Sequence, residues 1–183
     1  GEDLDEEVEI VADGKWGIVP DYTPYRFQRR FGDGIADWYR VDLGTGDRTL
    51  LAGEVQFGVE VGDGDSPALV YANDHWSAVE LTSLQKTILA EGRSFTQPIL
   101  DHDYPGPRPS WGIGGWVDTG DMVILYDKHD IWLVKTDGSY ASRLTRGEED
   151  GRVYRLARMD SSIGFGDTYI IDSSQPVWLS FRN

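Results

Sequence analysis

The feature that most constrains the fold is a sequence pattern that occurs three times along the chain. Each copy starts with Asp, a variable residue and an aromatic residue, and an apolar run follows it. The copies start at Asp37, Asp74 and Asp130, so the repeat is about 40 residues long once an insertion between the second and third is set aside. Such repeats, with several short strands each, are typical of β-propellers. We therefore expect an all-β fold of four-stranded antiparallel blades.

The third copy shows the strands of one blade most clearly. Residues 121–147 read DMVILYDKHDIWLVKTDGSYASRLTRG, in which polar turn residues separate three apolar runs. The alternation in DIWLVK and the Asp-Gly pair predict strands joined by hairpins, because Asp-Gly readily adopts positive φ. Residues 1–183 then form one partial propeller domain of about three and a half blades. We expect blades at residues 7–53, 54–92 and 111–147, a partial blade at residues 152–183 and an inserted loop at residues 93–110.

An incomplete set of blades needs a partner. One four-stranded sheet is too small to bury both of its faces, so propeller sheets stack on their neighbours. An open propeller would expose sheet edges and apolar faces, which proteins in water avoid. We therefore expect the partner to be the remainder of a longer parent chain or a second copy of this one, which would close the ring by homodimerisation.

Charge and composition exclude several classes of function. The chain has 32 Asp and Glu against 17 Lys and Arg, a formal net charge of −15, so we expect no binding to nucleic acid. The absence of Cys excludes disulfides and thiol catalysis but leaves the compartment open. No apolar run approaches the ~18 residues that span a bilayer, so we expect no membrane contact. The acidic start GEDLDEEVEI shows no signal peptide.

Most of the chain resembles the propellers of a known family. The string GIGGWVDTGDMVILYDKHDIWLVKTDGSYASRLTRG resembles a blade from the N-terminal propeller of large bacterial members of the prolyl oligopeptidase family. Another stretch, DGKWGIVPDYTPYRFQRRFGDGIADWYRVDLGTGDRTLL, is similar to a second blade of those proteins, and QPVWLSFRN resembles the entry into a further one. Periplasmic TolB-like propellers are near neighbours, since they share the Asp-Ile-Trp and Asp-Gly…Leu-Thr pattern.

The resemblance implies that this chain has a non-catalytic role. In the family, the propeller covers an α/β-hydrolase domain that carries the serine nucleophile, and it filters access of peptides. This sequence contains no Gly-x-Ser-x-Gly, so no catalytic residue can be carried over and a non-catalytic scaffold that gates access is expected. The alternative is a TolB-like propeller that serves as a protein- or ligand-binding module. The resemblance favours a periplasmic or secreted location.

The polar residues that could carry chemistry are better explained by structure. His75 and His129 fall within the repeat, and the repeated Asp is expected to form turns or to accept hydrogen bonds from nearby amides. Asp101-His102-Asp103 is the most ligand-like cluster, because alternate residues of an extended segment point the same way. Two carboxylates alone supply too few oxygens for a cation site. We therefore expect no catalytic residue, no metal and no cofactor.

Two segments outside the repeat are the candidate binding sites. YTPYRFQRR, at residues 22–30, is a basic and aromatic patch, and Arg suits the carboxylates of an acidic partner or a peptide. The inserted loop includes DHDYPGPRPSWG, whose prolines restrict its conformations. The alternatives are a contact with the rest of a parent protein for the first segment and packing over a blade edge for the second. The predicted binding residues are Arg26, Arg29, Arg30, Tyr104, Arg108 and Trp111.

Overall fold

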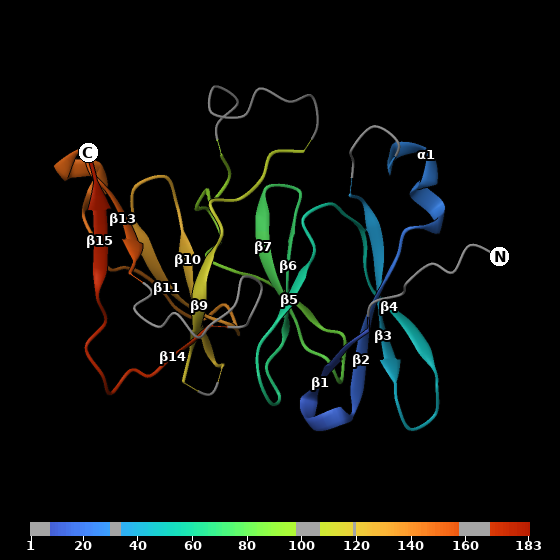
Figure 1. The fold of residues 1–183 in the computed structure, drawn as a ribbon. Coiled ribbons are helices and arrows are strands. Elements are labelled where there is room, and N and C mark those ends of the chain that lie inside the picture. The colour runs from blue at the N-terminus through green and yellow to red at the C-terminus, as the bar shows by residue number, and fades with distance from the viewer. Residues whose placement is uncertain (1–7, 30–33, 98–106, 119, 158–168) are drawn as a thin grey trace.

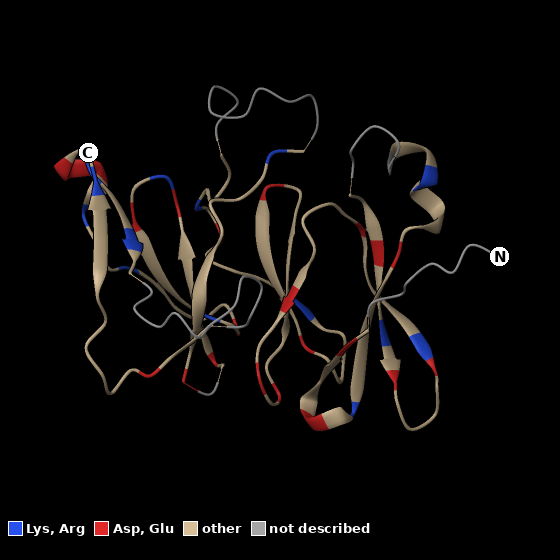
Figure 2. Ribbon diagram, in the orientation of Figure 1, with Lys and Arg blue, Asp and Glu red and all other residues tan. Residues whose placement is uncertain are grey.

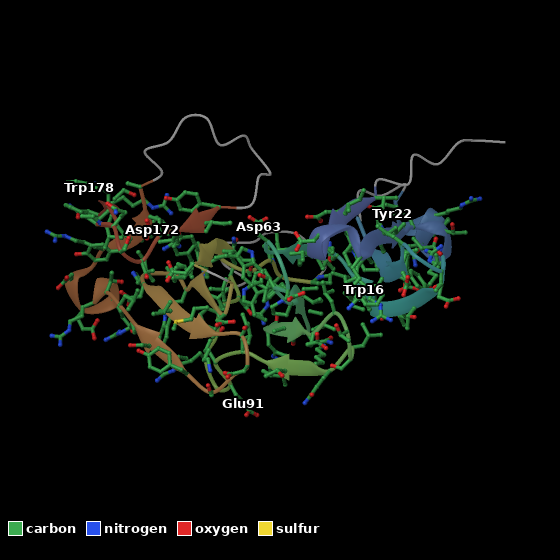
Figure 3. All side chains as sticks on the ribbon, turned by 90° about the horizontal axis from the view of Figure 1, so that it is seen from below. Trp16, Tyr22, Asp63, Glu91, Asp172 and Trp178 are labelled. Atoms are coloured by element: carbon green, nitrogen blue, oxygen red, sulfur yellow. The ribbon has the colours of Figure 1, made fainter. Side chains whose placement is uncertain are left out.

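The computed structural model describes residues 8–29, 34–97, 107–118, 120–157 and 169–183. Within these residues, three sheets are each built on four consecutive antiparallel strands, and a two-stranded antiparallel sheet follows them. The sheets stand side by side in chain order (Figure 1). Viewed at 90° to that orientation they fan out, with Asp63 toward the inner side and Glu91 on the outer side (Figure 3). The prediction of an all-β partial propeller with four-stranded blades is confirmed.

Tight hairpins connect the strands within each sheet. Asn73 and Asp74 form the turn between β6 and β7, and both have the positive φ that a two-residue hairpin requires. Gly138, in the predicted Asp-Gly turn, has a φ of 75°. The strands of the three sheets are β1 (Glu9–Val11), β2 (Trp16–Asp21), β3 (Ala36–Asp42) and β4 (Arg48–Val55); β5 (Val59–Val61), β6 (Ala68–Ala72), β7 (His75–Val79) and β8 (Lys86–Ile88); and β9 (Ile113–Val117), β10 (Met122–Tyr126), β11 (Ile131–Lys135) and β12 (Ala141–Arg143).

Short helices lie in the connections between strands. None of the described helices is long and apolar enough to cross a membrane. The helices are η1 (Ala12–Gly14), η2 (Thr23–Tyr25), α1 (Arg26–Arg29) and α2 (Gly147–Asp150).

A fifth strand joins the third sheet, and the sequence pattern does not predict it. The sequence places residues 170–171 in the partial fourth blade, but β14 (Ile170–Ile171) pairs in parallel with β9. The Trp116 amide donates to the Tyr169 carbonyl at 2.8 Å, and Gly115 makes room because a Cβ there would lie 2.6 Å from that oxygen. The pairing satisfies the free edge of β9. The fourth sheet therefore consists of β13 (Val153–Leu156) and β15 (Leu179–Arg182).

The repeat is offset by one residue in the second sheet. The β6–β7 turn contains two residues and the β10–β11 turn contains four, which is one more on each side. His75, and not Asp74, therefore has in the second sheet the position that Asp130 has in the third. Because a one-residue shift moves side chains to the opposite face, Trp76 and Trp132 are not equivalent. Both belong to the apolar cluster between the second and third sheets, which they enter from opposite sides. The aromatic residues of the repeat do pack between sheets, but the predicted alignment was wrong here.

Three apolar clusters join the four sheets in series. The cluster between the first and second sheets is centred on side chains such as Ile18, Val55 and Val70. The cluster between the second and third sheets contains Leu69 and Leu125, and a smaller one joins the third sheet to the fourth. Each inner sheet is thus covered on both faces, as stacked repeat units require.

Two of the repeated aspartates accept hydrogen bonds from residues later in the chain. Asp130 is 1% exposed and accepts hydrogen bonds from the Thr145 hydroxyl at 2.6 Å and from the Gly147 amide. Asp37 accepts a hydrogen bond from the Glu54 amide at 2.9 Å. In both cases the partner amide lies 17 residues after the aspartate. These two residues accept bonds from backbone amides, as predicted for the repeated Asp.

Both ends of the fan expose apolar side chains. On the first sheet, Ile10 is 66% exposed and Leu50 is 50% exposed. On the last sheet, Trp178 is 65% exposed and Phe181 is 56% exposed, and Figure 3 shows Trp178 at the far end of the fan. The inner sheets have neighbours on both faces, whereas these terminal sheets have a neighbour on only one side among the described residues.

Candidate functional site

A cleft of about 500 Å³ opens between the first and second sheets. It lies at the upper end of the strands in Figure 1, where β4 ends and the β6–β7 hairpin turns. Four segments form its walls: the helical connection after β2, the link from β4 to β5, the β6–β7 hairpin and the last residues of the inserted loop. The lining residues that bear on function are Tyr25, Gln28, Glu54, Gln56, Phe57, Tyr71, Asn73, Asp74 and Arg108.

The two segments that the sequence singled out meet at this cleft. Residues 22–30 contribute Tyr25 and Gln28, and the inserted loop contributes Pro107 and Arg108. The rest of the wall comes from strand ends within the repeat, chiefly Glu54, Phe57 and Tyr71, which the sequence reasoning missed. Of these, the only sequence signal was position: Glu54 and Phe57 lie at the start of the second predicted blade.

The predicted binding residues do not all reach the cleft. Arg108 lines it, whereas Arg26 is exposed on α1 and does not. Trp111 is half-buried in the cluster between the third and fourth sheets, where the Arg155 guanidinium lies 5.8 Å from its ring centroid. A binding role for these residues stays a prediction. The side chain of Arg29 and residues Arg30 and Tyr104 lie outside the described residues.

An ion pair fixes Arg108 in the wall of the cleft. Its Nη2 lies 2.6 Å from Oδ2 of Asp74, and the two side chains are 34% and 49% exposed. The Thr96 hydroxyl donates to the Asp74 carbonyl at 3.2 Å and is hydrogen-bonded to the Tyr71 hydroxyl at 2.7 Å. Because partly exposed ion pairs add about 0–1 kcal/mol to stability, the main effect of this pair is to set the charge of the cleft.

A second network holds the opposite wall. The Tyr25 hydroxyl donates to Oδ1 of Asp37 at 2.7 Å, and the same oxygen accepts the Glu54 amide. The hydrogen bond to Asp37, together with burial, raises the pKa of Tyr25 to about 12. Tyr25 therefore stays a neutral donor at physiological pH, and Asp37 is occupied by bonds within the wall.

Three residues of the wall have left-handed backbone. The φ angles are 56° at Glu54, 52° at Asn73 and 66° at Asp74. At Asn73 and Asp74 this conformation belongs to the hairpin turn and suits those residue types. At Glu54 it is unusual for a residue with a long side chain, and the bond from its amide to Asp37 holds it there. The backbone of Glu54 is therefore held in place at the edge of the cleft.

Aromatic rings form the floor and one side. Phe57 is 41% exposed, and its ring centroid lies 5.9 Å from that of the buried Tyr71. Tyr71 in turn contacts Trp76, with centroids 5.3 Å apart. Burial raises the pKa of the Tyr71 hydroxyl, so this ring also stays neutral. The cleft thus combines an accessible aromatic face with charged and amide groups.

The opposite end of the strands carries an acidic hollow of about 460 Å³. Asp63, Asp65, Asp118 and Asp121 line it, and Figure 2 shows acidic turns along that lower end. Hydrogen bonds from Ser173 lower the pKa of Asp118. Among the described residues, no group of three or more His, Cys, Asp and Glu could hold a metal ion.

The two described histidines, His75 and His129, are not among the residues that line the cleft. His75 is exposed at the start of β7, and Nδ1 of His129 lies 3.1 Å from the Arg152 carbonyl. His102 and the Asp101–Asp103 segment lie outside the described residues.

Comparison with known proteins shows a structural similarity to a solved protein. No protein-family model matches the chain, and no curated protein matches it in sequence. The chain is similar in structure to the crystal structure of TolB from Acinetobacter baumannii, with 16% sequence identity and a TM-score of 0.43. The match covers 79% of this chain and 33% of that one, so the chain spans about a third of the length of the protein it matches. The four stacked sheets themselves show the propeller-like arrangement, and the similarity gives no information on function.

Proposed function

We propose that this chain is a non-catalytic β-propeller segment that acts as a protein-binding module, with a segment of its partner held in the cleft between the first two sheets. The observation that carries the proposal is the convergence of two non-repeat segments on one cleft. Loops on a rigid scaffold are where binding residues concentrate, and here Tyr25 and Gln28 from the first segment and Arg108 from the end of the inserted loop reach the same cleft.

The size and lining of the cleft suit a peptide segment. A volume of about 500 Å³ falls within the roughly 300–1,000 Å³ of typical ligand sites. The exposed ring of Phe57 offers apolar contact, and Gln28 and Arg108 offer polar groups that could fix an orientation. Interfaces depend on a few such aromatic and Arg anchors.

Hydrogen bonds within the chain hold both walls of the cleft. Tyr25, Asp37 and Glu54 are linked by hydrogen bonds on one side, and Tyr71, Thr96 and Asp74 on the other. Groups fixed in advance lose little entropy on binding, which favours affinity.

Selection from a random dodecapeptide display library on the immobilised chain tests this proposal. Enriched peptides should bind the wild-type chain, and Phe57→Ala should weaken them at least tenfold. Tyr140→Ala is the matched control, because Tyr140 is 48% exposed and lies on the third sheet, away from the cleft. If no peptide is enriched, or if the enriched peptides bind equally well to Phe57→Ala, the proposal is wrong.

We further propose that apolar β-sheets of the same kind cover the terminal faces around Ile10 and Trp178. Sedimentation velocity distinguishes their source. If the wild-type chain is a dimer and Trp178→Ser is a monomer, a second copy covers these faces. If the wild-type chain is a monomer and Trp178→Ser increases its solubility, sheets from the rest of a longer protein cover them. A monomer whose solubility does not change with Trp178→Ser contradicts the proposal.

Gating of peptide access to a hydrolase domain is the second candidate function. It is supported by the resemblance of residues 111–147 to blades of the prolyl oligopeptidase family. The full reading frame that contains this chain should then encode a Gly-x-Ser-x-Gly motif, followed by Asp and His; without them, the gating role is excluded. A fluorophosphonate probe should leave the present chain unlabelled, and labelling would overturn its non-catalytic assignment.

A further inference from the structure

We infer that the cleft between the first and second sheets binds a cationic side chain, the ammonium of Lys or the guanidinium of Arg, presented by a peptide. This inference rests on the proposed protein-binding function and names the chemistry of the ligand. It is carried by the charges and the aromatic ring that the cleft brings together, and by two acceptors that have no partner among the described residues.

The charge balance of the wall favours a cation. Glu54 and Asp74 are the acidic residues among those that line the cleft, and Arg108 is the basic one. The charge of Arg108 is already matched by Asp74 at 2.6 Å. The carboxylate of Glu54 has neither an ion pair nor a hydrogen bond with the described residues, so it remains available to a ligand.

A buried acceptor in the wall also lacks a partner. Oε1 of Gln56 is shielded from solvent and forms no hydrogen bond with the described residues. Gln56 lines the same cleft as Glu54. A buried oxygen without a donor is unfavourable, and an ammonium or guanidinium group supplies several N–H donors at once. A carboxylate ligand has none to offer.

The aromatic lining is suited to the same ligand. The ring of Phe57 is 41% exposed and packs at 5.9 Å from Tyr71. Cations bind favourably over the face of an aromatic ring, and the apolar stem of Lys or Arg gains contact with the ring as well. An anionic ligand would instead have to bind Arg108, whose charge Asp74 already offsets at 2.6 Å.

Titration with three peptides tests the inference. The probes are acetyl-Ala-Ala-Lys-Ala-Ala-amide and the same peptide with Gln or Glu in place of Lys, followed by amide chemical shifts of the complete chain. The Lys peptide should bind at least tenfold more tightly than the other two, and 0.5 M salt should weaken it because the attraction is electrostatic. Shift changes should centre on residues 53–57 and 71–74.

Two glycine substitutions separate the charge of Glu54 from its backbone. Glu54→Gly and Asn73→Gly both relieve a positive φ in the wall, at 56° and 52°, but only the first removes a carboxylate. Glu54→Gly should abolish the preference for Lys over Gln without loss of thermal stability. Asn73→Gly should keep it.

The outcomes distinguish failure of the inference from failure of the proposed function. If the Gln or Glu peptide binds at the cleft as tightly as the Lys peptide, or if Glu54→Gly keeps the preference, the cationic specificity is wrong and the binding function stands. If neither these peptides nor those from the display library shift the cleft amides, both are wrong.

Discussion

Replacement of Asp130 by alanine tests whether the repeated aspartates hold the sheets in shape. The Asp130 carboxylate is 1% exposed, and it accepts hydrogen bonds from the Thr145 hydroxyl and the Gly147 amide. Nη1 of Arg143 lies 3.4 Å from its second oxygen. Asp130→Ala leaves the buried Gly147 amide and the half-buried Thr145 hydroxyl without this acceptor, and it removes one of the countercharges of Arg143.

The magnitude follows from this burial. Removal of one member of a buried charged network costs about 3–5 kcal/mol in the free energy of unfolding. Arg143 is 30% exposed and keeps its ion pair with Glu149, so we expect the lower end, about 3 kcal/mol. For a chain of this size, 1 kcal/mol lowers the melting temperature by about 2–4 °C, which gives a decrease of about 6–12 °C.

Asp74→Gly is the matched control, because glycine accepts the positive φ of 66° at this position while the side chain is removed. Asp74 occupies the predicted repeat position in the second sheet, but its side chain is 49% exposed and pairs with Arg108. Loss of such a pair costs about 0–1 kcal/mol. Circular dichroism during heating, with urea denaturation as a second measure, gives both values. If the two substitutions differ by less than about 1 kcal/mol, the structural role assigned to Asp130 is wrong.

Two further predictions concern the packing between sheets and the wall of the cleft. Trp132→Ala should lower the free energy of unfolding by about 3–5 kcal/mol, since the side chain is 7% exposed, meets Phe95 edge-on and donates to Asp127. Trp178→Ala, at the exposed end of the fan, should lower it by less than about 0.5 kcal/mol. Equal losses in urea denaturation would contradict this placement of Trp132. The pKa of Tyr25, raised to about 12, means that its hydrogen bond stabilises the fold fully below pH 10 and is lost as the pH rises from 10 to 12. Ultraviolet difference titration of the wild type against Tyr25→Phe should show that the Tyr25 hydroxyl ionises near pH 12. In Asp37→Asn this ionisation should shift toward pH 10. Ionisation of Tyr25 near pH 10 in the wild type would count against the hydrogen bond.

The sequence predicted the sheets well because each one is made of local hairpins. Alternating apolar residues and turn residues such as Asp137-Gly138 fix the pairing of neighbouring strands. The parallel strand β14 was beyond this reasoning, because Ile170–Ile171 carries no alternation and pairs with a strand more than fifty residues earlier. The offset at His75 was missed because only the length of the β6–β7 turn reveals it.

The cleft was predicted only in part, for the same reason. The segments at residues 22–30 and at Arg108 stood out because they interrupt the repeat. Glu54 lies near the end of β4 and Phe57 in the link to β5, and only the stacking of the first sheet on the second gives them a shared cleft with Arg108. No local pattern specifies which loops meet when sheets stack.

Hydrogen exchange, measured by mass spectrometry with and without a saturating display-selected peptide, tests the location of the binding site most directly. We expect slower exchange in residues 53–57, 71–74 and 107–108, and unchanged exchange at the acidic turns of residues 63–66 and 117–121. Protection centred on those acidic turns, or on the exposed terminal sheet at residues 177–182, would contradict a binding site between the first and second sheets.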